Sequence, residues 1–488
     1  MTNVLFTHSY FYKMDSKQWK NQTPFPPLGT IYAASKLREN GYNVSLFDVG
    51  LEENPLGLTA ILEDKKPDFL VIYDDGFNYL TKMCLTNMRD ACFEMISYGK
   101  KHNCKIIISS SDSTDHYEKY IEKGADYIIL GEGEETLLEL VNSIKAKPNL
   151  NASEINGIAF KENNEFIKTK KRNVLKNLDE LPIPAWDLVN IDSYKKVWKN
   201  SKQKFTLNLA TTRGCPYHCN WCAKPIYGQR YNSHSPERIT EMIKLLIENY
   251  GVNRFWMCDD IFGLKPNWVQ EFNEKLKDKH LKIFYYIQSR ADLLLKEDTI
   301  DALSKSGLEE VWIGAESGSQ KILDAMDKGT TIAQIEESTK LLQSKGVKVA
   351  FFIQYGYIGE SKEDIDKTIM MIKDLKPDNI GVSVSYPLPG TLFYDKVKHQ
   401  FKGKKNWRDS DDLAMLFKGT FNDSYYRKLQ RYTHKEFRKT LGISNLKNLF
   451  SKKINFNKIR SILLLLYYIP SSIIDRFQMR KMENLNSN

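Results

Sequence analysis

Near its middle the chain has the sequence TTRGCPYHCNWC, from Thr211 to Cys222. Three of the seven cysteines fall there, at the spacing C-x3-C-x2-C, directly after an apolar stretch that predicts a strand. Three thiolates on one loop can bind three irons of a cubane iron–sulfur cluster and leave the fourth iron open. Cys215, Cys219 and Cys222 are therefore the candidate metal ligands.

A structural zinc site is the alternative for these cysteines. Zinc takes four ligands and usually pairs cysteines two residues apart, so His218 or the distant Cys258 would have to complete the set. Disulfides are a weaker alternative, because an odd number of closely spaced cysteines in a long chain does not form a disulfide framework.

The motif resembles that of the radical S-adenosylmethionine (radical SAM) superfamily. The preceding Arg213-Gly214, the aromatic Trp221 and the order strand, loop, helix agree with it. The resemblance implies that the open iron chelates the amino and carboxylate groups of S-adenosylmethionine (SAM). It also implies that an electron from the cluster cleaves SAM to methionine and a 5′-deoxyadenosyl radical.

Length and composition predict a cytoplasmic protein of two or three domains. A chain of 488 residues is too long for one ordinary core, and 41% hydrophobic with 27% charged residues is typical of soluble globular proteins. The first residues enter a strand-like run, so we expect no signal peptide. Cys84, Cys92 and Cys104 lie in apolar or helical contexts, and buried free thiols suit a reducing compartment.

The net charge of +10 is concentrated at the end of the chain. Residues 418–488 carry 15 Lys and Arg against 4 Asp and Glu, whereas the preceding 417 residues carry 56 against 57. The body of the protein has no excess of positive charge with which to coat nucleic acid, so we expect no nucleic-acid partner.

Residues 1–140 alternate apolar strands with helices, one of them from Pro27 to Gly41. Continuous apolar strands separated by helices are typical of a parallel sheet covered on both faces. Five such strands predict the flavodoxin-like member of the doubly wound α/β class. The expected strands are Val4–Phe6, Val44–Phe47, Phe69–Ile72, Ile106–Ile108 and Tyr127–Leu130.

This segment also resembles the cobalamin-binding domain that precedes many radical SAM domains. The resemblance rests on Pro26-Pro27-Leu28-Gly29, on Asp48 after the second strand and on Gly131-Glu132-Gly133-Glu134. The histidine motif that supplies the lower ligand of cobalt in other cobalamin proteins is missing, and this radical SAM subgroup tolerates its absence.

Two loops depart from the cobalamin pattern. Ser109-Ser110-Ser111-Asp112-Ser113 replaces the usual glycines after the fourth strand, and Asp74-Asp75 follow the third strand, where small hydroxyl residues are usual. Side chains there can fill space that glycines would leave to a corrin. We expect cobalamin to bind because the serines are small, and a relict domain that binds none is the alternative.

Residues 141–204 form a connector, and the radical domain is expected from 205 to 395. In the connector Asn163-Asn164 predicts a hairpin, and the prolines at 182 and 184 keep the following segment extended. Six strand–helix units then predict the partial (β/α)6 barrel of the radical SAM family, with its chemistry at the carboxyl ends of the strands. The expected strands are Phe205–Ala210, Arg254–Met257, Ile283–Ile287, Glu310–Ile313, Val347–Tyr355 and Asn379–Ser385.

Residues at these strand ends match the positions of radical SAM motifs and predict a SAM site. The resemblance implies that Glu316 binds the ribose hydroxyls and that Arg290 binds the carboxylate of SAM. Trp221 and Ile358 would provide flat apolar walls for the adenine.

Asp259, Asp260 and Cys258 follow the second strand of this domain. The two aspartates are candidates for a contact with SAM or substrate, and the alternative is that they cap the next helix or hold water. Cys258 could donate hydrogen to a substrate radical, but we expect a buried thiol. Arg290 also has an alternative, an ordinary ion pair with Asp292.

Residues 396–488 predict a helical, basic tail, similar to the C-terminal segments of the family related to the anaerobic magnesium-protoporphyrin ester cyclase. The apolar stretch Ile462–Ile469 has 8 residues, short of the roughly 20 needed to cross a bilayer. It could lie on an anionic membrane surface or pack against protein, and both remain open. The cations around it are Lys452, Lys453, Lys458, Arg460, Arg476, Arg480 and Lys481.

The sequence therefore predicts a radical SAM enzyme that functionalises an unreactive carbon, with cobalamin-dependent methyl transfer as the favoured reaction. A cobalamin-independent radical cyclisation or oxidation is the alternative, and an iron–sulfur electron-transfer or sensing module is the non-enzymatic one. We expect a small-molecule or lipid-like substrate and an electron donor such as flavodoxin or ferredoxin.

The cysteine motif leads to a first prediction. Protein reconstituted anaerobically with iron and sulfide should hold close to four irons, as a cubane cluster requires. Cys219→Ala should lose both the visible absorption of the cluster and SAM cleavage, whereas Cys258→Ala should keep them. Stoichiometric zinc without iron-dependent absorption would contradict the assignment.

Overall fold

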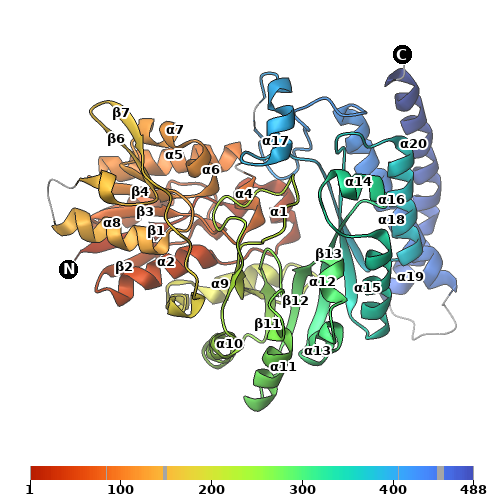
Figure 1. Cartoon of the computed structure of the whole chain (residues 1–488), viewed down its shortest axis with the longest axis horizontal. Helices are drawn as coiled ribbons and strands as arrows, with labels where there is room; N and C mark the ends of the chain where they lie inside the picture. Colours follow the sequence, from red (N-terminus) through yellow and green to blue (C-terminus); the bar gives the residue numbers. More distant parts are fainter. Residues whose placement is uncertain (1, 84, 147–150, 405, 448–455, 487–488) are drawn as a thin grey trace. The chain divides into compact units, whose positions relative to one another are not determined.

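The computed structural model describes residues 2–83, 85–146, 151–404, 406–447 and 456–486 (Figure 1). These residues divide into two units, and each is described by itself. Unit 1 comprises Met1–Pro216, Ala223–Tyr285 and Asn406–Asp412. Unit 2 comprises Tyr217–Cys222, Tyr286–Lys405 and Leu413–Asn488. Cys84, Lys452 and Lys453 lie outside the described residues.

The first sheet of unit 1 has the strand order β2-β1-β3-β4-β5-β6-β7. Its first five strands pair in parallel, and Val4 of β1 lies opposite both Val44 and Phe69. This order confirms the flavodoxin-like prediction. The strands are β1 (Asn3–Thr7), β2 (Asn43–Phe47), β3 (Phe69–Tyr73), β4 (Lys105–Ser109), β5 (Tyr127–Ile129), β6 (Ile158–Glu162) and β7 (Glu165–Lys168).

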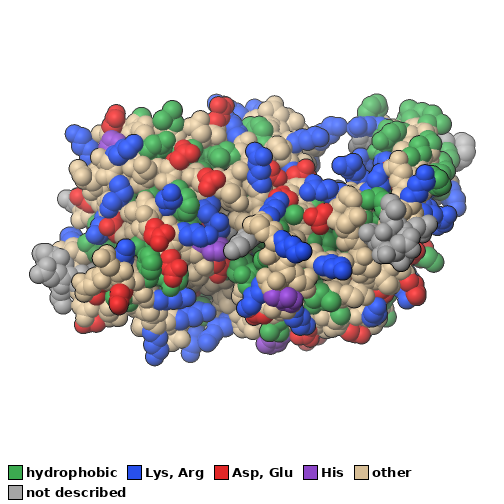
Figure 2. All heavy atoms as spheres, turned by 90° about the horizontal axis from the view of Figure 1, so that it is seen from above, with side chains coloured by type: hydrophobic (Ala, Val, Ile, Leu, Met, Phe, Trp, Pro, Cys, Tyr) green, Lys and Arg blue, Asp and Glu red, His purple; other side chains and the backbone are tan. Residues whose placement is uncertain are grey.

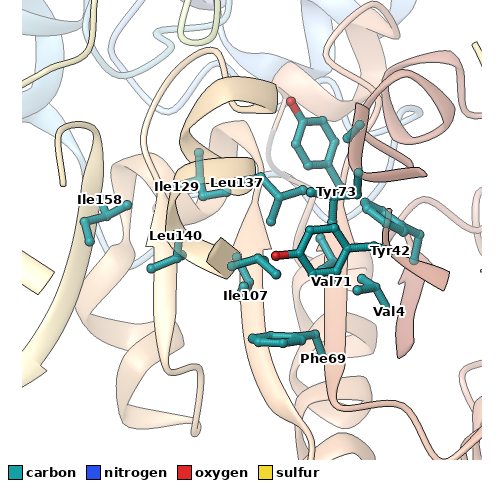
Figure 3. Close-up of a cluster of buried hydrophobic side chains, with 14 of the residues drawn as sticks. Val4, Tyr42, Phe69, Val71, Tyr73, Ile107, Ile129, Leu137, Leu140 and Ile158 are labelled. Atoms are coloured by element: carbon teal, nitrogen blue, oxygen red, sulfur yellow. The ribbon is translucent and has the colours of Figure 1, made fainter. Parts of the chain in front are cut away.

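Helices cover both faces of this sheet because successive strand residues point to opposite sides. On one face, Leu137 and Leu140 of α8 pack against Val71 of β3 and Ile107 of β4, which both point to that side of the sheet (Figure 3). On the other face, α5 brings Gly99 against Leu70 and Ile106. The helices of this part are α1 (Ser16–Asn21), α2 (Leu28–Glu39), α3 (Gly57–Lys65), α4 (Tyr79–Lys82), α5 (Thr86–Lys101), α6 (Ser111–Asp115), α7 (Tyr117–Glu122) and α8 (Glu134–Ala146).

The predicted hairpin of the connector is confirmed, and it extends the first sheet. Asn163 and Asn164 have φ of +47° and +68°, as a two-residue type I′ turn requires. Strand β6 pairs antiparallel with β5, and β7 with β6. The sequence indicated the hairpin but not its pairing with β5, because the partner of an edge strand is not encoded locally.

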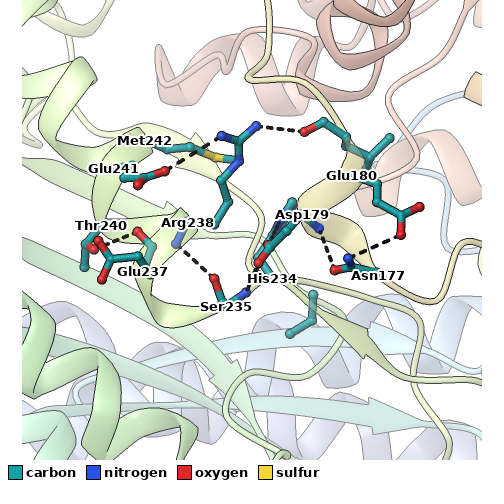
Figure 4. Close-up of polar contacts among 12 residues, drawn as sticks. Asn177, Asp179, Glu180, His234, Ser235, Glu237, Arg238, Thr240, Glu241 and Met242 are labelled. Carbon is teal, nitrogen blue, oxygen red and sulfur yellow. Dashed lines mark hydrogen bonds and ion pairs between the residues drawn. The ribbon is translucent and has the colours of Figure 1, made fainter.

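The rest of the connector is tied to helix α10 (Pro236–Tyr250) by buried polar contacts (Figure 4). Asp179 accepts hydrogen bonds from the backbone amide of Ser235 (3.1 Å) and lies 3.0 Å from Nδ1 of His234. Burial opposes ionisation of Asp179, but the bonds from His234 and Ser235 hold its pKa at about 2. Ser235 caps the helix, and Gly251 ends it with φ of +64°.

The second sheet has the strand order β15-β14-β13-β12-β11-β8, so all six predicted strands are present. In unit 1, β8 (Leu207–Leu209) pairs in parallel with β11 (Arg254–Met257). In unit 2, β14 (Lys348–Tyr355) pairs in parallel with β13 (Leu308–Glu316) and with β15 (Asn379–Val384). The other elements of unit 1 are β9 (Thr212–Arg213), β10 (Asn232–Ser233), α9 (Ile191–Trp198) and α11 (Trp268–Asp278), and β12 (Phe284–Ser289) contains the boundary between the units.

Unit 2 ends in the predicted helical tail. Gln430 of α18 donates a hydrogen bond to the carbonyl oxygen of Val382 in β15 (3.0 Å), so this helix lies beside the sheet. No helix among the described residues is long and apolar enough to span a bilayer. The helices of unit 2 are α12 (Ala291–Leu294), α13 (Thr299–Lys305), α14 (Gln320–Ala325), α15 (Ile332–Ser344), α16 (Lys362–Leu375), α17 (Leu392–Val397), α18 (Asp423–Lys447), α19 (Phe456–Leu463) and α20 (Leu465–Asn486).

The turn after β14 is held by a buried carboxyl group. One oxygen of Glu360 accepts the backbone amide of Gly356 at 2.6 Å, and its other oxygen is enclosed without a hydrogen-bond partner among the described residues. Burial raises the pKa of Glu360 to about 8. The group therefore keeps its proton on folding over a range of pH in which the unfolded chain releases it.

The buried carboxyl group of Glu360 predicts that the free energy of unfolding depends on pH. Because the folded pKa exceeds the unfolded one, the contribution of Glu360 is fully present below about pH 4.5 and is lost as the pH rises to about 8. Glu360→Gln should remove roughly 3–4 kcal/mol of this pH dependence. Melting temperatures at pH 5 and pH 8.5 test it, with Glu363→Gln on the exposed side of α16 as control. Equal pH profiles in wild type and Glu360→Gln would contradict it.

Candidate functional site

The start of the cysteine loop is fixed by Asp259, which follows β11. Its carboxylate accepts the backbone amides of Thr211 and Thr212, both at 2.7 Å, and the hydroxyl of Thr211 at 2.6 Å. Burial raises the pKa of Asp259 to about 7. Both carboxylate oxygens are thus engaged inside the protein, and Asp259 positions the loop.

The side chain of Arg213 is held by the turn that follows β5. Its guanidinium is buried and donates to Glu132 at 2.6 Å and to Glu134 at 2.7 Å. The Gly-Glu-Gly-Glu turn that suggested a cobalamin domain therefore holds the residue two positions before Cys215. Three aromatic rings lie 5.0–5.6 Å from this guanidinium, those of Tyr32, Phe77 and Tyr227.

Glycine is required between Arg213 and Cys215. Gly214 has φ of +78°, and a Cβ added there would lie 2.3 Å from the carbonyl oxygen of Arg230. The Arg-Gly of the motif thus combines a buried cation with a close approach of two backbone segments.

In unit 2, Asn220 fixes the second half of the loop. Its backbone amide donates to the carbonyl oxygen of Met326 at 3.0 Å, and its side-chain amide donates to that of Ala325 at 2.8 Å. Its side-chain oxygen accepts the hydroxyl of Tyr357 at 2.6 Å. This pair brings together the segments of Trp221 and Ile358, which follow Asn220 and Tyr357 in the sequence.

Arg290 lies beside a candidate iron ligand. One guanidinium nitrogen is 3.9 Å from Sγ of Cys219, and the group stacks on the ring of Tyr217 with its carbon 3.6 Å from the ring centroid. Arg290 also donates to Asp292 (2.9 Å) and to the carbonyl oxygen of Lys328 (2.7 Å). The alternative role as partner of Asp292 is therefore present as well.

Glu316 forms a buried ion pair that the sequence did not indicate. Nζ of Lys328 is 2.8 Å from its carboxylate, and both side chains are buried. Burial alone would lower the pKa of Lys328, but Glu316 and Cys219 raise it above its usual value. Gly314 leaves room for the pair, since a Cβ there would lie 2.6 Å from Nζ. Lys328 lies in a loop twelve residues after Glu316, where no motif points to it.

The other predicted residues differ in their burial and in their contacts. Trp221 is half-buried, and its indole N–H is enclosed without a hydrogen-bond partner among the described residues. Ile358 is 43% exposed, so its side chain can contact a ligand. Asp260 is engaged by Lys82 of α4 at 2.5 Å. Cys258 is a buried thiol, as expected.

The three loop cysteines suit an iron–sulfur cluster by the chemistry of their surroundings. All three are half-buried, and the cations of Arg290 and Lys328 lie near Cys219. Buried cations stabilise the net negative charge of a cluster held by thiolate ligands. Among the described residues no group of three His, Cys, Asp or Glu side chains converges on a point as one metal ion would require.

Protein side chains occupy the space around Asp112 at the carboxyl end of the first sheet. Asp112 is buried and accepts two bonds from Arg89, each 2.5 Å, and one from the hydroxyl of Tyr120 at 2.6 Å. Asp74 accepts the amide and the hydroxyl of Ser9, at 2.7 and 2.9 Å. The cavity left among these side chains has about 10 Å³, room for one water.

The segment around Ile226 and Tyr227 also covers this end of the sheet. A Cβ added to Gly76 would lie 3.3 Å from the hydroxyl of Tyr227, and one added to Gly131 would lie 3.4 Å from the carbonyl oxygen of Ile226. The space beside the serines is therefore occupied by Asp112 and its partners Arg89 and Tyr120, which the sequence did not indicate. We derive no step through cobalamin.

Comparisons with known proteins place this site in context. Residues 209–372 match the radical SAM superfamily. The chain is 28% identical to an uncharacterized methyltransferase of Pyrococcus horikoshii over 81% of this chain and 84% of that protein. It is 25% identical to the anaerobic magnesium-protoporphyrin IX monomethyl ester cyclase of Rubrivivax gelatinosus, over 81% of this chain and 70% of that enzyme.

The fold is similar to that of OxsB, a cobalamin-dependent S-adenosylmethionine radical enzyme solved with aqua-cobalamin and S-adenosylmethionine bound. The TM-score is 0.73 over 98% of this chain and 72% of that one, with 17% sequence identity. At this identity the likeness establishes the fold but not the ligands.

The filled sheet end predicts the outcome of a cofactor assay. After incubation with hydroxocobalamin and removal of free ligand, the reconstituted protein should carry its iron–sulfur absorption and no corrin absorption. Asp112→Gly should give the same result, because Asp74, Tyr120 and the covering segment remain. A stoichiometric corrin spectrum in the wild type would contradict the closed arrangement.

Proposed function

We propose that this radical SAM superfamily protein, whose radical domain follows a cobalamin-binding-type domain, cleaves SAM and removes a hydrogen atom from an unreactive substrate carbon. The observation that carries the proposal is the placement of Arg290 and Lys328 around Cys219, within a domain that matches the radical SAM superfamily. Both cations are buried, and each is already paired with one carboxylate, Arg290 with Asp292 and Lys328 with Glu316.

Cys215, Cys219 and Cys222 would hold three irons of a [4Fe–4S] cluster, leaving the fourth for the amino and carboxylate groups of SAM. When bound, the cluster supplies the electron that divides SAM into methionine and a 5′-deoxyadenosyl radical. The radical takes one hydrogen atom from the substrate and becomes 5′-deoxyadenosine. The electron comes from a donor such as flavodoxin or ferredoxin.

Side chains of unit 2 would bind the rest of SAM. The SAM carboxylate is assigned to Arg290, whose guanidinium lies beside Cys219 and would exchange one of its present acceptors for the carboxylate. Glu316 accepts the ribose hydroxyls with one oxygen while Lys328 holds the other. Trp221 and Ile358 provide apolar contact for the adenine. Asp259 and Asp260 act indirectly, by positioning the loop and by pairing with Lys82.

The substrate radical would then undergo cyclisation or oxidation without cobalamin. This choice follows from the filled end of the first sheet, and it reverses the preference for methyl transfer drawn from the sequence. Methyl transfer remains the second candidate, since the Pyrococcus horikoshii relative is named as a methyltransferase and the strand order is of the cobalamin-binding type. The substrate is expected to be a small or lipid-like molecule.

The proposal predicts how 5′-deoxyadenosine formation depends on SAM. Reduced, cobalamin-free protein should release 5′-deoxyadenosine and methionine in equal amounts. Arg290→Gln should keep the cluster but need roughly 10- to 150-fold more SAM for half-maximal cleavage, the equivalent of a lost charge-assisted contact. Chromatography of the products over a range of SAM concentrations measures both.

Lys321→Gln is the matched control, because the Lys321 side chain is 65% exposed and pairs with Asp364, which is not among the residues assigned to SAM. A protein that holds its cluster but forms no 5′-deoxyadenosine would favour an electron-transfer or sensing module. Unchanged SAM dependence in Arg290→Gln would place the SAM carboxylate elsewhere.

A further inference from the structure

The last two helices expose an apolar face. Leu463 and Leu466 are 63% and 81% exposed, and Ile459, Ile473, Ile474 and Phe477 are exposed as well. Ile459, Leu463, Leu466, Ile473 and Phe477 recur at multiples of three and four residues, so they form one stripe along α19 and α20. We call these six residues the tail face; Figure 2 shows hydrophobic side chains beside Lys and Arg at this end of the chain.

The opposite side of α20 is already used inside unit 2. Tyr468, Asp475 and Met479 are buried, and Asp475 pairs with Lys435 of α18 at 2.6 Å. The helix is therefore anchored by one side, and the tail face is not needed to hold it. A helix that is apolar on both sides has a second surface to bury.

Positive charge borders the tail face. Arg476 and Arg480 are exposed one turn apart beside Phe477. They line a cavity of about 150 Å³ together with Lys362 and the carboxylates of Asp366 and Glu483. Lys481 lies over the ring of Phe477, 4.7 Å from its centroid. Among the described residues of α19 and α20 the carboxylates are Asp475 and Glu483, and both are engaged by α18.

We propose that the tail face docks on an anionic phospholipid membrane. Its apolar side chains fit the boundary between headgroups and acyl chains, and Arg476, Arg480 and Lys481 fit lipid phosphates. A second copy of the chain is the weaker occupant, because a two-fold contact would set these cations against each other. Neither helix combines the length and the apolarity needed to span the bilayer, so they would lie in its surface.

Vesicle sedimentation with the full-length, cluster-loaded protein tests this docking. Binding to vesicles of 70% phosphatidylcholine and 30% phosphatidylglycerol should exceed binding to pure phosphatidylcholine at least tenfold, and should fall as salt rises. Leu463→Glu with Leu466→Glu should lower it at least tenfold, and Arg476→Gln with Arg480→Gln should abolish the preference for anionic lipid.

Leu56→Glu, an equally exposed leucine of unit 1, is the control and should bind as wild type does. Formation of 5′-deoxyadenosine in solution checks that each variant is folded, because none of these residues belongs to the SAM site. No binding to anionic vesicles, or equal binding by all variants, would overturn the proposal. A dimer in sedimentation velocity that Leu463→Glu with Leu466→Glu dissociates, without vesicle binding, would make the tail face a subunit interface.

Discussion

A buried guanidinium held by two carboxylates is the interaction on which the first unit depends. Removing such charges from water costs several kcal/mol per ion, so Arg213 is stable only where Glu132 and Glu134 meet it at hydrogen-bonding distance. The turn after β5 and the start of the cysteine loop must therefore keep one relative position. Asp259 adds a second constraint through Thr211 and Thr212.

In the second unit, neutral and cationic side chains fix the position of the cysteine loop. Asn220 satisfies backbone and side-chain partners from three segments, which leaves the loop little freedom. Near Cys219 the cations Arg290 and Lys328 are paired with the carboxylates of Asp292 and Glu316, so these four side chains carry no net charge. A guanidinium at this position favours a bound carboxylate, which is the chemistry expected of a SAM site.

In the first sheet the strand order and the side chains at the strand ends have to be considered separately, because a fold does not by itself fix its ligand. The strand order is that of a cobalamin-binding domain, yet the ends of β1, β3 and β4 are occupied by protein side chains. Asp112 illustrates the cause: a buried carboxylate needs donors, and Arg89 and Tyr120 provide them by filling the space. The domain then serves to hold Arg213 and the cysteine loop.

The sequence by itself determined the α/β order, the five parallel strands, helix α10 with its caps and the hairpin at Asn163, because these depend on periodicity, capping and turn residues. It also indicated the three cysteines, whose spacing is local. By resemblance it indicated the residues at the carboxyl ends of the strands of the second sheet. Only the tertiary structure decided the contacts of Lys328, Asn220 and Arg213, whose partners lie far away in the chain. It likewise decided that Asp112 and its partners close the sheet end, since packing depends on side chains that meet only after folding.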